Sequence, residues 1–260
     1  MTYAYFPGCT LKTKGKELDL WGHKAAEALG FTLQELPQWQ CCGAVYPMAK
    51  DEIATRLSSV RAILSATEQK QDLVTLCSAC HHVIKRVKGD LQRDETIRDR
   101  VSRYLGQELP EETCDVLHYL EVLRDRIGFD EIAKKVTNPL TGRKIGAYYG
   151  CLLLRPGKEM GFDDPENPTI MEDFIRAIGA EPVIWARRNE CCGGYCTVEN
   201  REYAKKQVAK LMDNAKASGA EELITACPLC LYNLTENAEN GLSVHYFTEL
   251  LAEALGVKEI

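Results

Sequence analysis

The sequence predicts an α/β fold of two homologous lobes, each with a small parallel sheet flanked by helices, related by a pseudo-twofold axis. Two observations lead to this expectation. The 260 residues carry the same motifs twice, because the CCG of 41–43 recurs at 191–193 and the CxxC of 77–80 recurs at 227–230. Each copy also alternates short apolar runs with amphipathic stretches, which is typical of β-α-β units.

The repeat also predicts where the chain divides. Cys9 is matched by Cys151, and the His-Tyr dipeptide at 118–119 is matched by the one at 245–246, 127 positions later. The loop-like stretch TNPLTGRK then separates the copies. We expect a first cysteine-rich lobe at 1–137 and a second at 138–260.

The elements follow in the same order in both copies. In the first, strands are expected at 3–8, 32–36 and 72–77, and helices at 15–30 and 51–69. In the second, strands are expected at 144–150, 181–185 and 222–227, and helices at 168–179 and 200–218. The cysteines then fall at the carboxyl ends of strands and at helix starts. This is the edge where open α/β sheets bind ligands.

Composition and charge exclude several kinds of partner and binding site. The net charge is −6 and the chain has no long basic run, which excludes a nucleic-acid partner. The longest apolar patch, at 145–154, is too short to span a bilayer, so we expect no direct membrane span and a cytoplasmic protein. Twelve cysteines in a reducing compartment favour metal binding over disulfides.

Each copy offers five matched cysteines as ligands. Structural zinc and an ordinary cubane cluster each use four protein ligands, so five thiolates with an adjacent pair suit a larger, irregular polynuclear centre. Buried packing cysteines and two structural zinc sites are the alternatives. The ten candidates are Cys9, Cys41, Cys42, Cys77 and Cys80 in the first lobe, and Cys151, Cys191, Cys192, Cys227 and Cys230 in the second.

The spacing resembles that of a known family. C-x31-CCG-x33-CxxC in the first copy and C-x39-CCG-x33-CxxC in the second resemble the duplicated cysteine-rich CCG domain of the B-type subunit of heterodisulfide reductase. The resemblance implies two noncubane 4Fe-4S clusters, one per lobe, held by these ten cysteines. It also implies partners in one complex: a flavin-containing subunit and a small 4Fe-4S ferredoxin-like subunit. This chain has no flavin motif of its own.

The function implied by this resemblance is that of an iron-sulfur catalytic subunit, an oxidoreductase acting on sulfur groups. Two clusters would each deliver one electron to a small-molecule or carrier-bound disulfide, or oxidise a thiol pair in reverse. An iron of each cluster would capture one departing thiolate, so that no catalytic residue beyond the cluster ligands is needed. The alternative is a CCG-type electron-transfer subunit of a flavoprotein dehydrogenase complex that relays electrons to a carrier or quinone.

Several other residues are expected near the centres. If the two clusters act on one disulfide, both motifs must face a common cleft between the lobes. Histidines are expected to pack or to hydrogen-bond beside the clusters rather than ligate, and Cys114 and Cys196 are expected to be bystanders. The histidines are His81, His82, His118 and His245. The cations expected near the mouth of the cleft, with solvated surface charge as the alternative role of each, are Lys12, Lys14, Lys16, Arg155 and Lys158.

Overall fold

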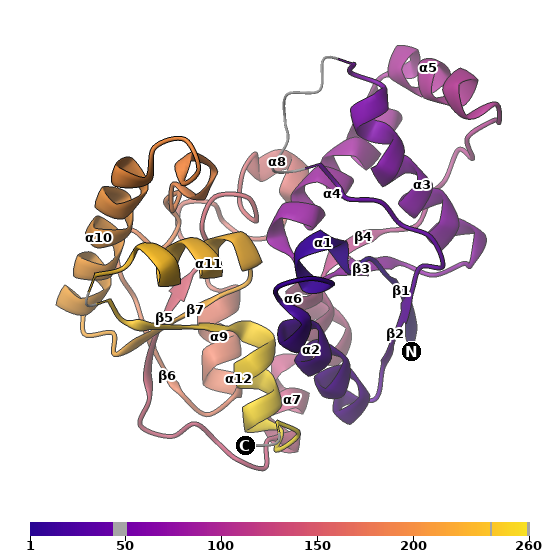
Figure 1. Cartoon of the computed structure of the whole chain (residues 1–260). Coiled ribbons are helices and arrows are strands. Elements are labelled where there is room, and N and C mark those ends of the chain that lie inside the picture. The colour runs from indigo at the N-terminus through magenta and orange to yellow at the C-terminus, as the bar shows by residue number, and fades with distance from the viewer. Residues whose placement is uncertain (44–50, 240, 259–260) are drawn as a thin grey trace.

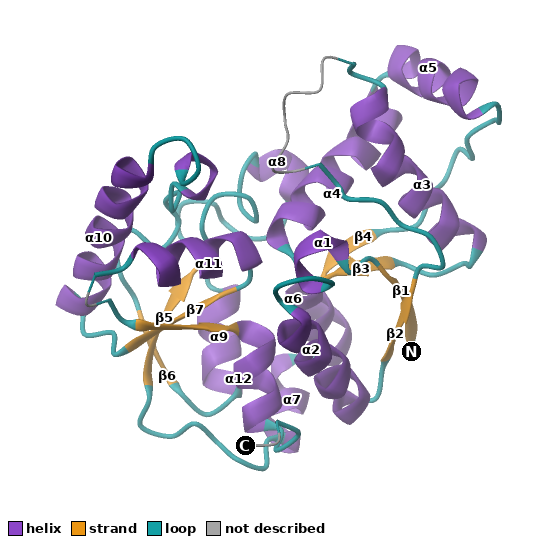
Figure 2. Ribbon diagram, viewed as in Figure 1, coloured by secondary structure: helices purple, strands orange, loops and turns teal. Residues whose placement is uncertain are grey.

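The computed structural model describes residues 1–43, 51–239 and 241–258, and it contains two four-stranded parallel sheets (Figure 2). The first sheet has the order β2-β1-β3-β4 and the second has the order β6-β5-β7-β8. The strands of the first are β1 (Thr2–Tyr5), β2 (Thr32–Glu35), β3 (Leu73–Thr75) and β4 (Val116–His118). Those of the second are β5 (Lys144–Tyr148), β6 (Glu181–Val183), β7 (Glu222–Thr225) and β8 (Ser243–Tyr246). The predicted two-lobed α/β fold is confirmed.

Helices flank both sheets. In the first lobe they are α1 (Gly8–Leu11), α2 (Lys16–Leu29), α3 (Ala54–Glu68), α4 (Ser78–Arg93), α5 (Glu95–Leu105), α6 (Tyr119–Glu121), the π-helix η1 (Val122–Ile127) and α7 (Phe129–Lys135). In the second they are α8 (Gly157–Met160), α9 (Ile170–Ala177), the 3-10 helix η2 (Gly194–Cys196), α10 (Arg201–Ala217), α11 (Pro228–Asn237) and α12 (Phe247–Ala254).

The central strands β3 and β7 carry the CxxC motifs to the carboxyl edge of each sheet. Both strands are buried along their whole length, as expected for strands covered on both faces. Helices α4 and α11 begin directly after them, with Cys77 and Cys227 as N-caps. Pro228 occupies the first turn of α11, where its missing N–H costs no intrahelical bond.

Each lobe contributes a helix that packs against the other lobe. Helix α12 follows the last strand of the second lobe but packs against α2 of the first, and α7 of the first lobe packs against α9 of the second (Figure 1). The Thr248 hydroxyl donates to the Leu18 carbonyl at 2.9 Å, and one hydrophobic core contains buried residues of both lobes. The boundary between residues 137 and 138 remains a proposal, but the two sides of it share a core.

The register of the outer strands corrects the sequence alignment of the His-Tyr dipeptides. Thr75 pairs with His118 in the first sheet, and the matching Thr225 pairs with Tyr246 in the second. His118 is therefore equivalent to Tyr246 rather than to His245, and the expected match is wrong by one residue. The two His-Tyr dipeptides are identical in sequence, but β4 ends at the histidine of the first and β8 ends at the tyrosine of the second.

Candidate metal centres

Five cysteines of the first lobe gather at the carboxyl edge of its sheet. Cys9 lies in α1 directly after β1, and the adjacent Cys41 and Cys42 lie in the loop after β2. Cys77 and Cys80 stand at the start of α4. The Cys41 sulfur lies 3.6 Å from that of Cys9, and the Cys42 sulfur lies 3.4 Å from that of Cys80.

The second lobe repeats this pairing. The Cys192 sulfur lies 3.5 Å from that of Cys230, and the neighbouring Cys191 thiol raises the pKa of Cys151. Cys227 and Cys230 stand at the start of α11. All five of these cysteines line one small cavity. The structure therefore brings together the five predicted ligands of each lobe.

Two glycines that sequence reasoning did not single out allow this approach. Gly8 and Gly150 precede Cys9 and Cys151 and have φ angles of +74° and +64°. A Cβ atom at Gly8 would lie 2.7 Å from the Cys80 sulfur, and one at Gly150 would lie 3.3 Å from that of Cys230. The left-handed backbone and the missing side chain let the chain turn directly over the CxxC sulfur.

The donor set suits a cluster of soft metal ions. Within 1–43, 51–239 and 241–258, no three His, Cys, Asp or Glu side chains form a ready-made site for a metal ion. The thiols instead lie in pairs 3.4 to 3.6 Å apart, close to the ~3.8 Å between two sulfurs that share one tetrahedral ion with bonds of ~2.3 Å. Five thiols per lobe fit an iron-sulfur centre, because thiolates are its usual ligands.

Crowding of the thiols affects their ionisation. Burial raises the pKa of Cys41 to about 11, and the neighbouring Cys191 thiol raises the pKa of Cys192 to about 12. The pKa of Cys227 is lowered instead, because Cys230, Cys77 and backbone N–H groups of α11 donate to its sulfur. Most of these thiols would ionise only with a cation beside them, so metal binding is expected to release protons.

The two CxxC motifs meet between the lobes. Cys227 raises the pKa of Cys77, and Cys77 lowers the pKa of Cys227, because the two thiols lie near each other. Beside them, Ser78 donates from its backbone N–H and its hydroxyl to the Ala226 carbonyl, at 3.2 and 2.7 Å. The CxxC segments of the two lobes therefore face each other directly, as cleavage of one disulfide by two clusters would require.

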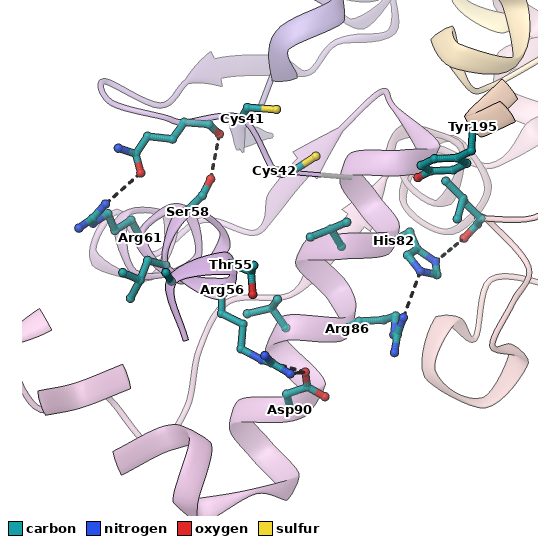
Figure 3. Close-up of a pocket in the computed structure, with 17 residues that line it drawn as sticks. Cys41, Cys42, Thr55, Arg56, Ser58, Arg61, His82, Arg86, Asp90 and Tyr195 are labelled. Carbon is teal, nitrogen blue, oxygen red and sulfur yellow. Dashed lines mark hydrogen bonds and ion pairs between the residues drawn. The ribbon is translucent and has the colours of Figure 1, made fainter. Parts of the chain in front are cut away.

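A cavity of about 760 Å³ lies beside the first centre (Figure 3). Cys41 and Cys42 stand on one side of it, and Leu152 and Tyr195 of the second lobe help to line it. Tyr195 also borders the small cavity among the second-lobe cysteines. The Tyr195 ring thus lies between the surroundings of the two centres, a position that no signal in the sequence identified.

The cations of the large cavity differ from those expected. Lys12 pairs with Glu35 at 2.6 Å, and Arg155 pairs with Glu166 at 3.0 Å. None of the five expected cations is among the described residues that line the cavity, which leaves the alternative of solvated surface charge for each of them. Its guanidinium groups come from α3 and α4 and are those of Arg56, Arg61 and Arg86.

Two of these arginines have neutral side chains as their hydrogen-bonding partners. Arg56 pairs with Asp90 at 2.9 Å, but Arg61 donates to the Gln40 side chain at 2.9 Å. Arg86 lies 3.5 Å from His82 Nε2, and burial lowers the pKa of His82. The cavity is therefore positively charged in its described lining, and it would attract an anion.

The histidines contact carboxylates and carbonyls. His81 Nε2 lies 3.0 Å from Glu121, and the His82 ring lies 3.1 Å from the Leu152 carbonyl. His118 Nδ1 accepts from the Leu120 N–H, so its proton lies on Nε2, 3.0 Å from the Leu76 carbonyl. His245 lies outward, between two glutamates. These contacts suit supporting residues rather than metal ligands.

The two remaining cysteines line neither cavity beside the centres. The Cys114 sulfur lies 3.5 Å from the Ile63 carbonyl, and the residue packs against a hydrophobic cluster of the first lobe. Cys196 lies in η2. Both positions agree with a bystander role.

Known relatives share the duplicated motif. The cysteine-rich CCG domain matches this chain twice, at residues 3–85 and 145–235. The 8-methylmenaquinol:fumarate reductase membrane anchor subunit of Wolinella succinogenes is 31% identical over 98% of this chain and 92% of that protein. The B-type subunit of the ferredoxin:CoB-CoM heterodisulfide reductase of Methanosarcina mazei is 24% identical over 96% of this chain and 88% of that protein.

A third relative and a solved structure extend the likeness. A protein of Archaeoglobus profundus, named as similar to the B-type subunit of heterodisulfide reductase, is 26% identical over 91% of this chain and 82% of that protein. A hypothetical protein from Helicobacter pylori has the same fold, with a TM-score of 0.75 and 14% identity. The likeness covers 99% of this chain, which spans about half of that solved chain (49%).

The name of the Wolinella relative raises the question of a membrane span. Among the described residues, no helix combines the length and the apolar character needed to cross a bilayer. The two matched segments, the paired cysteines and the relatives agree on one assignment. This chain belongs to the family of proteins with the cysteine-rich CCG domain, carries two copies of that domain, and is an electron-transfer subunit related to the B-type subunit of heterodisulfide reductase.

Proposed function

We propose that this chain is the iron-sulfur catalytic subunit of a cytoplasmic heterodisulfide reductase-like complex. The observation that carries the proposal is the meeting of the two CxxC motifs, where Ser78 of one lobe donates two hydrogen bonds to the Ala226 carbonyl of the other. Two centres built on these motifs would lie close enough to act on one substrate. The relatives named as heterodisulfide reductase subunits support the same function.

Ten cysteines would hold two noncubane 4Fe-4S clusters, one per lobe. The ligands of the first would be Cys9, Cys41, Cys42, Cys77 and Cys80, and those of the second Cys151, Cys191, Cys192, Cys227 and Cys230. Such clusters supply single electrons and a Lewis-acidic iron for a sulfur group. The net reaction converts one disulfide, two electrons and two protons into two thiols. The electrons would come from a flavin-containing partner through a small 4Fe-4S ferredoxin-like subunit.

The large cavity would admit the disulfide to the first centre. Arg61 and Arg86 face groups without negative charge and would bind an anionic end of the substrate by charge-assisted hydrogen bonds. Asp90 neutralises Arg56, which leaves the other two guanidinium groups to set the charge of the cavity. The ring of His82, on α4, contacts the Leu152 carbonyl of the second lobe and so joins the lobes beside the cavity.

A second candidate function rests on one relative. The protein of Wolinella succinogenes, 31% identical to this chain, is named a membrane anchor subunit of an 8-methylmenaquinol:fumarate reductase. In this alternative the chain relays electrons between a flavoprotein and a carrier or quinone. The two centres would then act as successive stations, and no disulfide would be bound.

One assay separates these functions. Anaerobically purified protein with bound iron and sulfide is given a reduced viologen dye and either anionic disulfides or a water-soluble quinone. The proposal expects dye oxidation that depends on a disulfide and releases two thiols per disulfide. Turnover with the quinone alone would instead support the relay, and bound zinc without sulfide would exclude both.

A further inference from the structure

Two equivalent side chains end the outer strands beside the CxxC motifs. His118 closes β4 and Tyr246 closes β8, at matching positions of the two sheets. Both side chains are fully buried, with 0% exposure. A buried polar group needs a hydrogen-bond partner, so the partners of these two side chains show what they hold in place.

Both side chains reach the residues that precede the first cysteine of each CxxC. The Tyr246 hydroxyl lies 2.6 Å from the Leu76 carbonyl of the first lobe and 3.1 Å from the Ala226 carbonyl of its own lobe. His118 Nε2 donates to the same Leu76 carbonyl at 3.0 Å. The Ala226 carbonyl also accepts both hydrogen bonds from Ser78 of the first lobe.

These contacts join the two motifs across the lobe boundary. Leu76 immediately precedes Cys77, and Ala226 immediately precedes Cys227. A shift of one CxxC segment against the other would break the buried hydrogen bonds of Tyr246 and Ser78. The buried hydroxyl and N–H of Ser78 would then lose their acceptor, which costs free energy and resists such a shift.

We propose that Tyr246 is a positioning residue whose hydroxyl fixes the separation of the two centres by holding the backbone before Cys77 against the backbone before Cys227. This inference rests on the proposed function, because it needs a centre in each lobe. Electron exchange between two sites and the magnetic coupling of their spins both fall steeply with distance. A small increase in separation therefore changes both properties without removing any ligand.

The test compares Tyr246→Phe with Tyr119→Phe. Tyr119 is also fully buried, and its hydroxyl donates at 3.0 Å to the Gly22 carbonyl of α2 rather than to a carbonyl that precedes a CxxC motif. Each variant loses one buried hydroxyl, so general loss of packing or stability is matched. Both proteins are purified without oxygen and assayed for iron and sulfide, and the spin-spin splitting of their partly reduced centres is measured by EPR.

The expected result is full iron and sulfide in both variants, with the spin-spin splitting reduced in Tyr246→Phe and unchanged in Tyr119→Phe. An unchanged splitting in Tyr246→Phe, or an equal change in both variants, would overturn the positioning role while the proposed function stands. Wild-type protein without iron and sulfide would overturn the proposed function and this inference together.

A second variant covers the case in which Tyr246→Phe does not hold iron. Ser78→Ala removes only the hydroxyl that donates to the Ala226 carbonyl, and the matching residue of the second lobe, Pro228, has no hydroxyl. Ser78→Ala is expected to reduce the same splitting with iron content retained. A wild-type splitting in Ser78→Ala would then overturn the inference.

Discussion

The two lobes have the same frame but different surroundings at their centres. The first centre borders a cavity of about 760 Å³. This cavity is lined by Cys41, Cys42 and two arginines whose side-chain partners are neutral. All five cysteines of the second centre line a much smaller cavity. Duplication therefore supplies two sets of ligands, and the residues around them differ. Under the proposed function, substrate access belongs to the first lobe.

The two helices that begin at the CxxC motifs, α4 and α11, also differ in the residues that pack beside them. His81, directly after Cys80, is buried against Glu121, and Lys85 reaches the same carboxylate at 3.1 Å. Although burial opposes it, these two partners lower the pKa of Glu121 to about 2. Leu231 occupies the place of His81 in the second lobe and packs against the core. The first lobe thus supports its CxxC helix with buried charge and the second supports it with apolar contacts.

The largest expected effect comes from separating the lobes. Because α12 packs on α2 and both lobes share one core, residues 1–137 expressed alone should fail to fold. Far-UV circular dichroism and a denaturant titration check this. Co-expression of 1–137 with 138–260 should restore a folded pair, since Thr137 and Asn138 both donate to the Ala254 carbonyl near the cut. A cooperative unfolding transition of 1–137 alone would contradict the shared core.

The next effect distinguishes the two ligand sets. Cys191→Ala should remove the second centre and leave the first, so iron per chain should fall by about half. Cys41→Ala should do the same to the first centre. Cys196→Ala is the matched control, because Cys196 follows the same CCG motif but lines neither cavity. Iron content and EPR spectra that are unchanged in Cys191→Ala would remove this residue from the ligand set.

A smaller effect tests whether the first lobe receives the substrate. Arg86→Gln removes a cation from the large cavity and should raise KM for an anionic disulfide by about tenfold to a hundredfold, the usual range for a hydrogen bond to a charged group. Iron content should not change. Arg176→Gln is the control, because Arg176 lies on α9 and pairs with Asp173. Equal KM values for the two variants would place substrate binding elsewhere.

The smallest effect concerns the residues that close the outer strands. Burial lowers the pKa of His118 to about 3, whereas an unfolded histidine titrates near 6.5. Between these values the unfolded chain binds the proton and the folded chain does not, so stability falls as pH falls below 6.5. From pH 6.5 to 5.0 the loss is about 1.5 kcal/mol. Tyr246, its counterpart, does not ionise in this range, because burial raises its pKa.

The measurement is denaturant unfolding of wild type and His118→Gln at pH 6.5 and pH 5.0, with equal iron content. The free energy of unfolding of the wild type should fall by about 1.5 kcal/mol more than that of His118→Gln. A pH dependence that is the same in both proteins would show that His118 is not held neutral by burial.

The ten candidate ligands could be predicted from the sequence, because their order and spacing repeat and because strands of buried residues carry them to one sheet edge. The His-Tyr match was wrong by one residue, since identical letters do not reveal at which residue a strand ends. The packing of α7 and α12 against the opposite lobe was not predicted, because the sequence of an amphipathic helix shows that it has a buried face but not which lobe covers that face. Arg61 and Arg86 were not predicted, because only the packing of α3 and α4 shows that they line the cavity.

The central claim is that each lobe holds its own polynuclear iron-sulfur centre. The most direct measurement is the iron, acid-labile sulfide and zinc content of wild-type protein purified without oxygen. Two 4Fe-4S clusters predict about eight irons and about eight sulfides per chain, with little zinc. About two zinc ions per chain without sulfide would contradict the account and assign the ten cysteines to structural zinc sites.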